Sequence, residues 1–232
     1  MGQYYVIANI DKKEKISPLT GVKLMEFGWF GDRIVEALCG MMRGRWRGDR
    51  VYVVGDYADR RKEGQPEENW HGAVEAALDE LGYGEDESLY AIAKEDFKDV
   101  TGEALEAAIE ECWWGDPRYL VNEAERVFVD LEGCPVDHVS VDGRGRVEHE
   151  SIHPLPLLLA MGNGQGGGDY FGVNAEAVGS WVKDAARVRI LLEGEGEKLA
   201  GYRRVDPGFV ETRERDEVEA RIEAIRKALA NL

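Results

Sequence analysis

The sequence predicts an α+β fold built from two related, mainly antiparallel strand modules, with a helical insert between them and a helix at the C terminus. The first observation is a repeat: the strand-like segment that ends at Asn9 has a degenerate counterpart that ends at Asn122. The second is a Trp-x-x-Asp motif before a later strand-like run in each half, at Trp46 and at Trp181. Repeated units bury their apolar faces against each other, so the repeat sets the architecture. The seam between the modules is then a natural place for a concave ligand site.

Four segments follow from this interpretation: a first module over 1–59, a helical insert over 60–116, a second module over 117–204 and a C-terminal helix over 205–232. With 232 residues, 44% of them hydrophobic, the chain can bury a sizeable core. We expect the four segments to form one compact unit.

Apolar periodicity and turn residues predict the elements of the first module. Apolar runs predict strands at 4–10, at 22–27 and at 50–54, with a further short strand ending at Pro18. Asp32 is a helix N-cap candidate, because the apolar residues after it recur three, four and seven positions apart, as on one face of a helix.

The insert and the second module follow the same rules. Ala/Glu/Leu-rich stretches at 72–81 and 103–112 predict two helices, the second with Thr101 as its N-cap. The second module is predicted to contain strands at 119–121, 126–131, 136–141, 146–150, 187–192 and 199–203. The apolar stripe of the C-terminal helix, which Thr212 caps, is expected to pack on the protein's own body, so we predict a monomer or a weak dimer.

Composition excludes two classes of partner. The chain has 29 Lys and Arg residues against 46 Asp and Glu residues, a net charge of −17, and so acidic a surface repels phosphate backbones and anionic lipid headgroups. We therefore expect no nucleic-acid and no membrane partner. Solubility, a salt-rich environment and a basic protein partner are three open explanations of the acidity.

Cysteine usage and the N terminus indicate a cytoplasmic protein. Cys39, Cys112 and Cys134 are odd in number and widely spaced, which suggests neither a disulfide framework nor a zinc site. The first residues lack the basic start and the apolar core of a signal peptide, and the longest apolar run, 155–162, is too short to span a bilayer. We expect a soluble protein in a reducing compartment.

The glycine-rich segment 162–168 is the most distinctive local motif. It satisfies G-x-G-x-x-G, but no helical pattern follows it, so a dinucleotide-binding fingerprint is not indicated. So many glycines are expected either where a ligand approaches the backbone or where a tight loop crosses a neighbouring strand. On the ligand interpretation, the contacts come from the loop and from polar residues that face it: Asn163, Gly164, Gly166, Gly167, Gly168, Asp169, Tyr170, Asp49, Asp56 and His153.

Histidines near this loop raise the question of a metal site. A five-residue hairpin loop pairs Val141 with Val147, and this register places His138 and His149 on opposite faces of the hairpin. We therefore expect no metal site, and His153 is kept as a candidate because it lies just before the glycine-rich segment. No nucleophile and base can be paired from spacing alone, so catalytic residues and cofactors stay open.

Several motifs resemble a family of bacteriophage, bacterial and fungal proteins. They are the opening Met-Gly-Gln-Tyr-Tyr, the Trp-Arg-Gly-Asp-Arg that begins at Trp46, and the Gly-Asn-Gly-Gln-Gly-Gly-Gly-Asp-Tyr that begins at Gly162. The resemblance covers both halves but neither the insert nor the last helix. The second half departs from it at 182–184, where Val-Lys-Asp replaces the Ala-Gly-Asp that the pattern suggests, so a site there is one-sided. The resemblance implies an intracellular, phage-related protein and implies nothing about its chemistry.

Two functions of different classes follow. In the first, the protein binds a small polar ligand, such as a nucleotide, at the seam through its glycine-rich loop; the polar residues around that loop support it. In the second, the protein is an acidic inhibitor, immunity or accessory factor that binds a basic protein partner, which the net charge supports. The sequence does not decide whether the protein is an enzyme.

Overall fold

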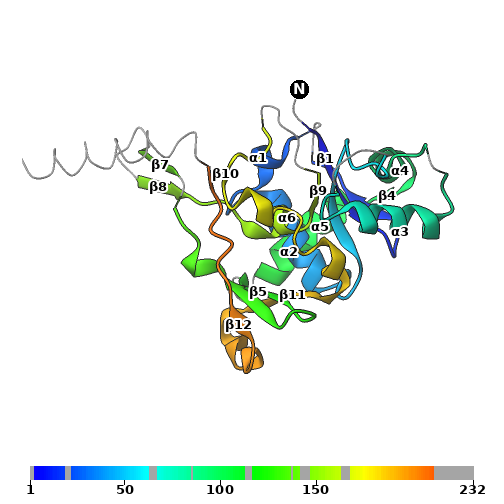
Figure 1. Ribbon diagram of the computed structural model, residues 1–232. Coiled ribbons are helices and arrows are strands. Elements are labelled where there is room, and N and C mark those ends of the chain that lie inside the picture. Colours follow the sequence, from blue (N-terminus) through cyan, green and yellow to red (C-terminus); the bar gives the residue numbers. More distant parts are fainter. Residues whose placement is uncertain are drawn as a thin grey trace, which may run out of the picture.

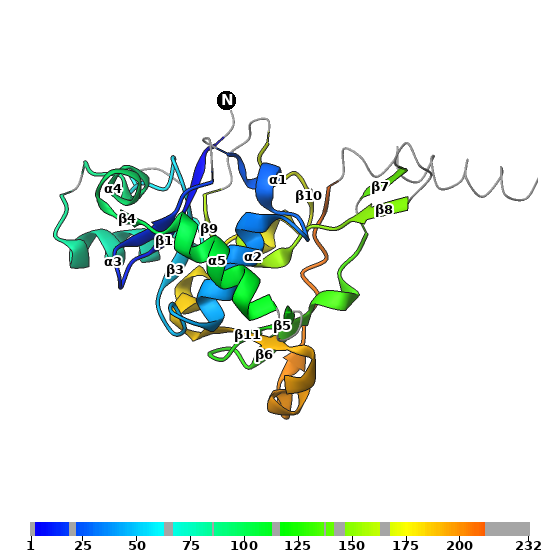
Figure 2. The same ribbon diagram turned by 180° about the vertical axis from the view of Figure 1, so that it is seen from behind.

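The computed structural model describes residues 3–18, 22–62, 67–84, 86–112, 117–136, 138–141, 147–162 and 168–211. Over these residues the fold is α+β, as predicted, with helices packed around two mixed sheets (Figures 1 and 2). The predicted C-terminal helix lies outside the described residues from 212 onward. In the part of the chain that the structure describes, no helix combines the length and the apolar character needed to cross a membrane.

The first sheet has the strand order β4-β2-β1-β3-β9. Its strands are β1 (Tyr5–Asn9), β2 (Glu14–Ile16), β3 (Val51–Gly55), β4 (Lys98–Asp99) and β9 (Ala160–Met161). β1 pairs antiparallel with β2 and β3, whereas β4 and β9 add parallel strands at the two edges. Every residue of β1 and β3 is buried, which is why these strands are apolar in continuous runs rather than in alternation.

The second sheet has the strand order β11-β5-β6-β12. Its strands are β5 (Pro117–Asn122), β6 (Val127–Asp130), β11 (Val188–Leu192) and β12 (Arg203–Arg204). β5 pairs antiparallel with β6 and β11, and β12 runs parallel to β6. In each sheet the central strand, β1 or β5, lies between its hairpin partner, β2 or β6, and a later antiparallel strand, β3 or β11. A short parallel strand, β4 or β12, lies beyond the hairpin partner.

The two sheets agree in register as well as in strand order. Asn9 and Asn122 each end the central strand and lie opposite the first residue of the later antiparallel strand. The residue before the hairpin partner is left-handed in both sheets, Lys13 with φ 52° and Arg126 with φ 55°. The carbonyl oxygen of each of these two residues accepts a hydrogen bond of 2.9 Å from the first residue of the parallel edge strand. The internal duplication itself stays a prediction, which these shared contacts support.

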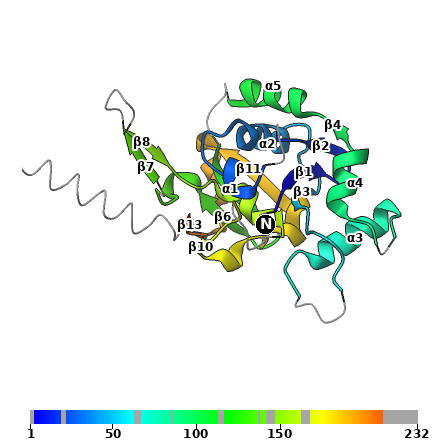
Figure 3. The same cartoon turned by 90° about the horizontal axis from the view of Figure 1, so that it is seen from above.

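Helices cover the first sheet on both faces. They are α1 (Leu24–Phe27), α2 (Arg33–Arg43), α3 (His71–Leu81), α4 (Leu89–Asp96), α5 (Thr101–Cys112) and α6 (Pro154–Leu158). α2 and α5 lie together on one side of the sheet, and α3 and α4 lie on the other (Figure 3). Gly40 allows the close approach of α2 to α5, because a Cβ there would lie 3.2 Å from Cα of Ala108. Since β4 lies between α4 and α5, the stretch 60–116 contributes a strand as well as helices.

One predicted strand in the first half is wrong. Residues 22–27 contain α1 instead, because Leu24 and Phe27 are buried at the i,i+3 spacing of a helical turn. The turn is also satisfied locally, since the carboxylate of Glu26 accepts a hydrogen bond of 3.0 Å from the backbone N–H of Lys23.

Of the two predicted helix caps that lie in the described residues, one is confirmed and one is replaced by a neighbour. Asp32 caps α2, and its Oδ1 accepts the N–H of Ile34 at 2.8 Å. At the start of α5, Oδ1 of Asp99 accepts both the N–H of Thr101 at 2.9 Å and its hydroxyl at 2.6 Å. The carboxylate therefore takes the capping role predicted for Thr101, because a charged acceptor binds the free helical N–H groups more strongly than a hydroxyl does.

The hairpin of β7 (His138–Val141) and β8 (Val147–Glu150) has the predicted register, with Val141 opposite Val147. The remaining elements are short. They are the 3-10 turns η1 (Leu131–Gly133), η2 (Ala175–Ala177), η3 (Val182–Arg187) and η4 (Glu193–Leu199) and the strands β10 (Gly172–Val173) and β13 (Val210–Glu211).

The two halves complete each other across the seam. The N–H of Val53 in β3 donates to the carbonyl of Leu159, next to β9, at 3.0 Å. In the other direction, the guanidinium of Arg43 at the end of α2 donates to the carbonyl of Ile190 in β11 at 3.1 Å. The buried apolar residues of both sheets form one continuous core, so the predicted seam is a packed interface.

Candidate ligand pocket

A cavity of about 570 Å³ lies where α2 meets the second half of the chain. One wall comes from α2 and the turn before it, with Phe30, Val35, Glu36 and Cys39. The facing wall comes from the second half, with Arg118, Leu131, Glu132, His153 and Glu193. The cavity therefore lies between the two halves, but no described residue of the glycine-rich segment lines it.

Backbone pairing between two distant segments places His153 beside α2. The N–H of Phe30 donates to the carbonyl of Ser151 at 2.9 Å, and the N–H of His153 donates to the carbonyl of Gly28 at 2.8 Å. The residues between them form an antiparallel bridge. The ring of Phe30 then packs against the imidazole of His153, with centroids 4.6 Å apart and planes inclined by 52°.

His153 is the N-cap of α6. Its Nδ1 accepts the N–H of Leu155 at 3.2 Å, and Pro154 occupies the first helical position, where proline is favoured. A neutral imidazole whose Nδ1 is an acceptor carries its proton on Nε2. Burial lowers the pKa of His153 to about 3, so the ring is neutral near pH 7.

Cys39 is the nearest reactive group to this ring, with Sγ 4.0 Å from Nε2 of His153. A thiol–imidazole nucleophile needs a ring nitrogen that takes the thiol proton. Here Nε2 already bears a proton and the N–H of Leu155 occupies the other lone pair. The pair therefore presents a thiol and a fixed N–H donor to the cavity rather than a thiolate nucleophile.

The outer part of the cavity is acidic. Glu36, Glu132 and Glu193 are exposed, and Arg118 is the one cation among the described lining residues. The protein itself holds this guanidinium: its Nε lies 2.8 Å from Oδ1 of Asp130, and a second nitrogen pairs with Glu132. The lining thus carries three carboxylates and one guanidinium, and one of the three carboxylates, Glu132, is a partner of that guanidinium.

The glycine-rich segment is described only at its ends, and four predicted contact residues lie outside the described residues: Asn163, Gly164, Gly166 and Gly167. Gly162 has φ 91°, and a Cβ there would overlap the side-chain amide of Gln3. Gly168 has φ 89°, and a Cβ there would overlap the side chain of Lys23. At both ends, glycine allows the close approach of the protein's own side chains, as the tight-loop interpretation predicts.

Asp169 and Tyr170 are buried and bonded within the protein. Oδ1 of Asp169 accepts the backbone N–H of Gln3 at 3.3 Å. The hydroxyl of Tyr170 accepts the N–H of Val210 at 2.9 Å and donates to the carbonyl of Val173 at 2.5 Å, which ties β10 to β13. These contacts anchor the end of the glycine-rich segment, and neither residue lines the seam cavity.

A smaller cavity of about 270 Å³ borders the glycine-rich segment at Gly162, with Tyr57, Trp70 and Val178 among its other lining residues. It shares no lining residue with the seam cavity.

Two of the predicted aspartates, Asp49 and Asp56, lie beyond opposite ends of β3, roughly 20 Å apart along the strand. The Oδ1 of Asp56 accepts the N–H of Tyr4 at 3.2 Å. The carboxylate of Asp169, at the end of the glycine-rich segment, is also nearby. Burial raises the pKa of Asp56, and the neighbouring carboxylate of Asp169 adds to the increase. Asp49 is at the far end, so the two aspartates do not form one site.

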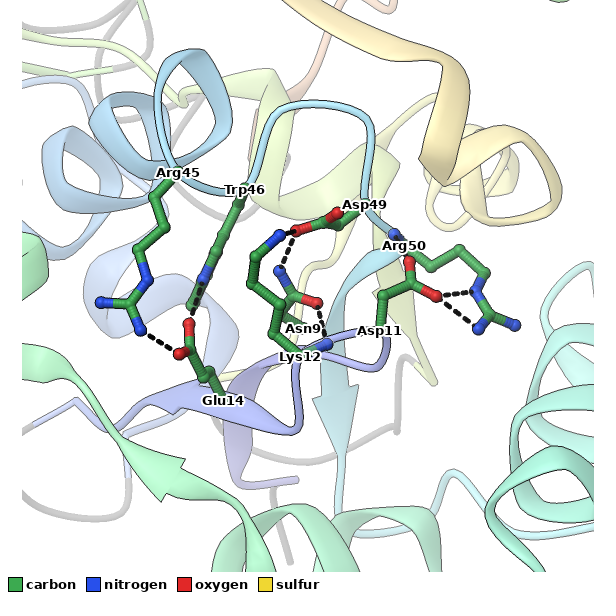
Figure 4. Close-up of polar contacts among 8 residues, drawn as sticks. All are labelled: Asn9, Asp11, Lys12, Glu14, Arg45, Trp46, Asp49 and Arg50. Atoms are coloured by element: carbon green, nitrogen blue, oxygen red, sulfur yellow. Dashed lines mark hydrogen bonds and ion pairs between the residues drawn. The ribbon is translucent and has the colours of Figure 1, made fainter.

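Asp49 belongs instead to a polar cluster at the end of β1 (Figure 4). Nδ2 of Asn9 donates to Oδ2 of Asp49 at 2.8 Å, and the ammonium of Lys12 pairs with the same oxygen. Oδ1 of Asn9 accepts the N–H of Lys12 at 3.0 Å. Beside them, the indole N–H of Trp46 donates to Glu14 at 2.8 Å. These side chains are satisfied within the protein and hold the turn that follows β1.

The second half repeats the asparagine–aspartate contact. Nδ2 of Asn122 donates to Oδ2 of Asp184 at 3.0 Å, and Oδ1 of Asn122 accepts the N–H groups of Ala124 and Glu125 at 3.0 and 3.2 Å. Asn9 and Asn122 are both fully buried. The shared Trp-x-x-Asp motif thus supplies, in each half, the carboxylate that binds the buried asparagine.

Of the predicted ligand contacts, the structure brings His153 to the seam cavity and places the other described ones elsewhere. Sequence reasoning named as ligand contacts none of the other lining residues, which include Phe30, Val35, Cys39 and Leu131 and the charged residues of the outer part. A signal existed for two of them, because Val35 and Cys39 are four positions apart on the amphipathic helix after Asp32 and share a face. Leu131 follows no local pattern, since its place depends on how the halves pack.

Within the described ranges, no group of three or more His, Cys, Asp or Glu side chains is arranged to hold a metal ion. A scan against protein-family models found no match to the chain, and neither did searches of curated proteins and of solved structures. The geometry of the seam cavity is therefore the basis for assigning a function.

Proposed function

We propose that this protein binds a small molecule in the cavity between its two halves. The observation that supports this proposal is that both halves line one cavity of about 570 Å³, in which apolar walls surround a few polar groups. Ligand pockets typically enclose about 300–1,000 Å³ and have this mixture of lining residues.

Rigid elements hold the residues that would contact the ligand. Val35 and Cys39 lie on α2, which its cap and its packing against α5 fix in place. His153 is fixed by the cap of α6 and by the ring of Phe30. A site built on helices and on a paired segment needs little rearrangement to bind, so less affinity is lost to ordering.

A thermal-shift screen of small molecules tests the proposal, because a ligand that binds only the folded state raises the melting temperature. We expect hits whose shift is abolished by Val35→Phe, which places an aromatic ring in the seam cavity. Val178→Phe is the matched control, since it makes the same change in the smaller cavity beside Gly162. Hits that Val178→Phe abolishes and Val35→Phe leaves intact would move the site to the glycine-rich segment and overturn the proposal.

A second function, that of an acidic protein that binds a basic partner, is favoured by the pairing of arginines with carboxylates of the same chain. Several described arginines pair with carboxylates of the same chain, as Arg50 does with Asp11 and Glu80, and as Arg60 does with Asp79. The net charge of −17 is then carried by surplus carboxylates, which attract a cationic surface at long range.

Salt separates the two functions. A basic protein partner should be retained in a pull-down at low ionic strength, be lost at high ionic strength because exposed charges are then screened, and still bind the Val35→Phe variant. If no protein is retained at either ionic strength, the second function is wrong.

A further inference from the structure

Resting on the proposed function, we infer the chemical class of the ligand: an amine with an apolar body, whose inner end carries a hydrogen-bond acceptor for Nε2 of His153 and whose ammonium lies at the acidic outer end of the cavity, beside Glu193. The inference follows from the arrangement of the lining residues: a buried hydrogen-bond donor at one end, apolar side chains next to it and exposed carboxylates at the other end.

At the inner end of the cavity, Nε2 of His153 is a hydrogen-bond donor and cannot become an acceptor while the ring is neutral. The N–H of Leu155 is bonded to Nδ1 of His153, so the single proton of the neutral ring is on Nε2. Among the described residues, Nε2 faces the sulfur of Cys39 at 4.0 Å, which is a long contact and a weak acceptor. An ether, carbonyl or aromatic-nitrogen acceptor on a ligand makes a stronger bond there than the sulfur does.

Burial of the lining residues gives the direction of the cavity. His153 and Cys39 are only 4% and 2% exposed, whereas Glu36, Glu132 and Glu193 are exposed. The acceptor of a bound ligand therefore points inward and its charged group points toward solvent. Phe30, Val35 and Leu131 supply the apolar surface for the part of the ligand between these ends.

The charges at the outer end select a cation over an anion. Arg118 is held by Asp130 and Glu132, so its guanidinium is already neutralised by the protein. The lining as a whole is negatively charged, because its three carboxylates outnumber its one guanidinium, and this charge repels a phosphate or a carboxylate and attracts an ammonium group. A nucleotide, the ligand first expected from the glycine-rich segment, has the wrong charge for this cavity.

Four related compounds separate the two recognition elements. Para-methoxyphenethylamine carries both the ammonium and the acceptor, and phenethylamine carries the ammonium alone. Para-methoxyphenyl ethanol and para-methoxyphenylacetate keep the acceptor but replace the ammonium with a neutral or an anionic group. We expect calorimetry at low ionic strength to rank them in that order, with about threefold to tenfold tighter binding for the methoxy amine than for phenethylamine.

Two variants assign the two elements to residues. His153→Asn keeps an N-cap residue on α6 and removes the ring donor, so it should lower the affinity for the methoxy amine to that for phenethylamine and leave phenethylamine unaffected. Glu193→Gln removes an exposed charge from the cavity lining without disturbing the core, so it should weaken both amines alike and leave the alcohol unchanged.

The outcomes separate this inference from the function on which it rests. If para-methoxyphenylacetate binds as tightly as the amines and Val35→Phe abolishes its binding, the cavity is a ligand site but the ligand class is wrong. If Glu193→Gln leaves both amines unaffected, the carboxylates do not hold the ammonium and the inference is overturned. If neither these compounds nor the screened hits respond to Val35→Phe, the proposed function itself fails.

Discussion

Two buried asparagines hold equivalent places in the two halves, and each joins a hairpin turn to the aspartate of a Trp-x-x-Asp motif. In each case the side-chain amide donates to the aspartate and the side-chain carbonyl accepts backbone N–H groups of the turn. A buried amide that satisfies both of its ends in this way fixes a turn more firmly than the turn residues do alone.

Replacing either asparagine should therefore destabilise the whole protein to a similar extent. Asn9→Ala and Asn122→Ala each remove a donor to a partly buried aspartate and the acceptor for the N–H groups of the turn, and we expect each to lower the free energy of unfolding by about 1–3 kcal/mol. Urea unfolding measures the effect, with Asn69→Ala at an exposed position as the control. A loss at one asparagine only would contradict the equivalence.

The neutral state of His153 makes stability depend on pH. Burial lowers its pKa from 6.5 to about 3 in the folded protein, whereas the unfolded chain keeps the ordinary value. Between these values the unfolded state binds more protons, so the free energy of unfolding increases with pH. The contribution is fully present above pH 6.5 and is lost as the pH falls toward 3.

Urea unfolding at several pH values tests this contribution. Between about pH 7 and about pH 4, His153→Asn should lose less free energy of unfolding than the wild type, because asparagine does not titrate but still caps α6. Equal losses in the two proteins would show that other groups cause the acid dependence.

At the scale of elements, the sequence predicted those whose signals are local. The helix after Asp32 formed because its cap and its apolar spacing agree, and the β7–β8 register followed from matching valines on one face. The strand predicted at 22–27 failed because a run of apolar residues this short suits a helical turn equally well. The seam cavity itself had no local signal, since α2 and the second half, which form its walls, are far apart in the sequence.

The glycine-rich segment shows that the prediction of sites from local sequence signals is limited in the same way. Glycine content signals close approach but does not say what approaches, and at Gly162 and Gly168 it is the protein's own side chains. His153 was named as a candidate because it precedes this segment, whereas its place in the cavity lining depends on its pairing with Gly28 and on α2.

One glycine in the second half connects two elements in a way that can be tested. Gly179 has φ 73°, and a Cβ there would lie 2.7 Å from the carbonyl oxygen of Ala160 in β9. We expect Gly179→Ala to lower the free energy of unfolding by about 2 kcal/mol or more, because it adds both backbone strain and overlap.

The matched control for that change is Gly72→Ala in α3, where nothing lies within 4 Å of the added methyl group. Alanine is the better helix former, so this change should be neutral or stabilise the protein by up to about 1 kcal/mol. A chemical-denaturation experiment on both variants decides the point, and a neutral Gly179→Ala would show that β9 adjusts freely.

The whole molecule is held together by contacts that cross from one half to the other. One core runs through both sheets, α2 reaches β11 through Arg43, and β9 completes the first sheet. The halves are alike in sheet order and register, yet each depends on the other for part of its structure.

The place of β9 has a consequence for synthesis on the ribosome. β3, with the sequence Val-Tyr-Val-Val-Gly, lacks its neighbour on one side until residue 161 has been made. An unpaired, fully apolar strand edge is a template for pairing with another chain. Nascent chains in which β3 has emerged from the ribosome and β9 has not are therefore exposed to aggregation through this edge, and a pause in translation at that stage lengthens the exposure.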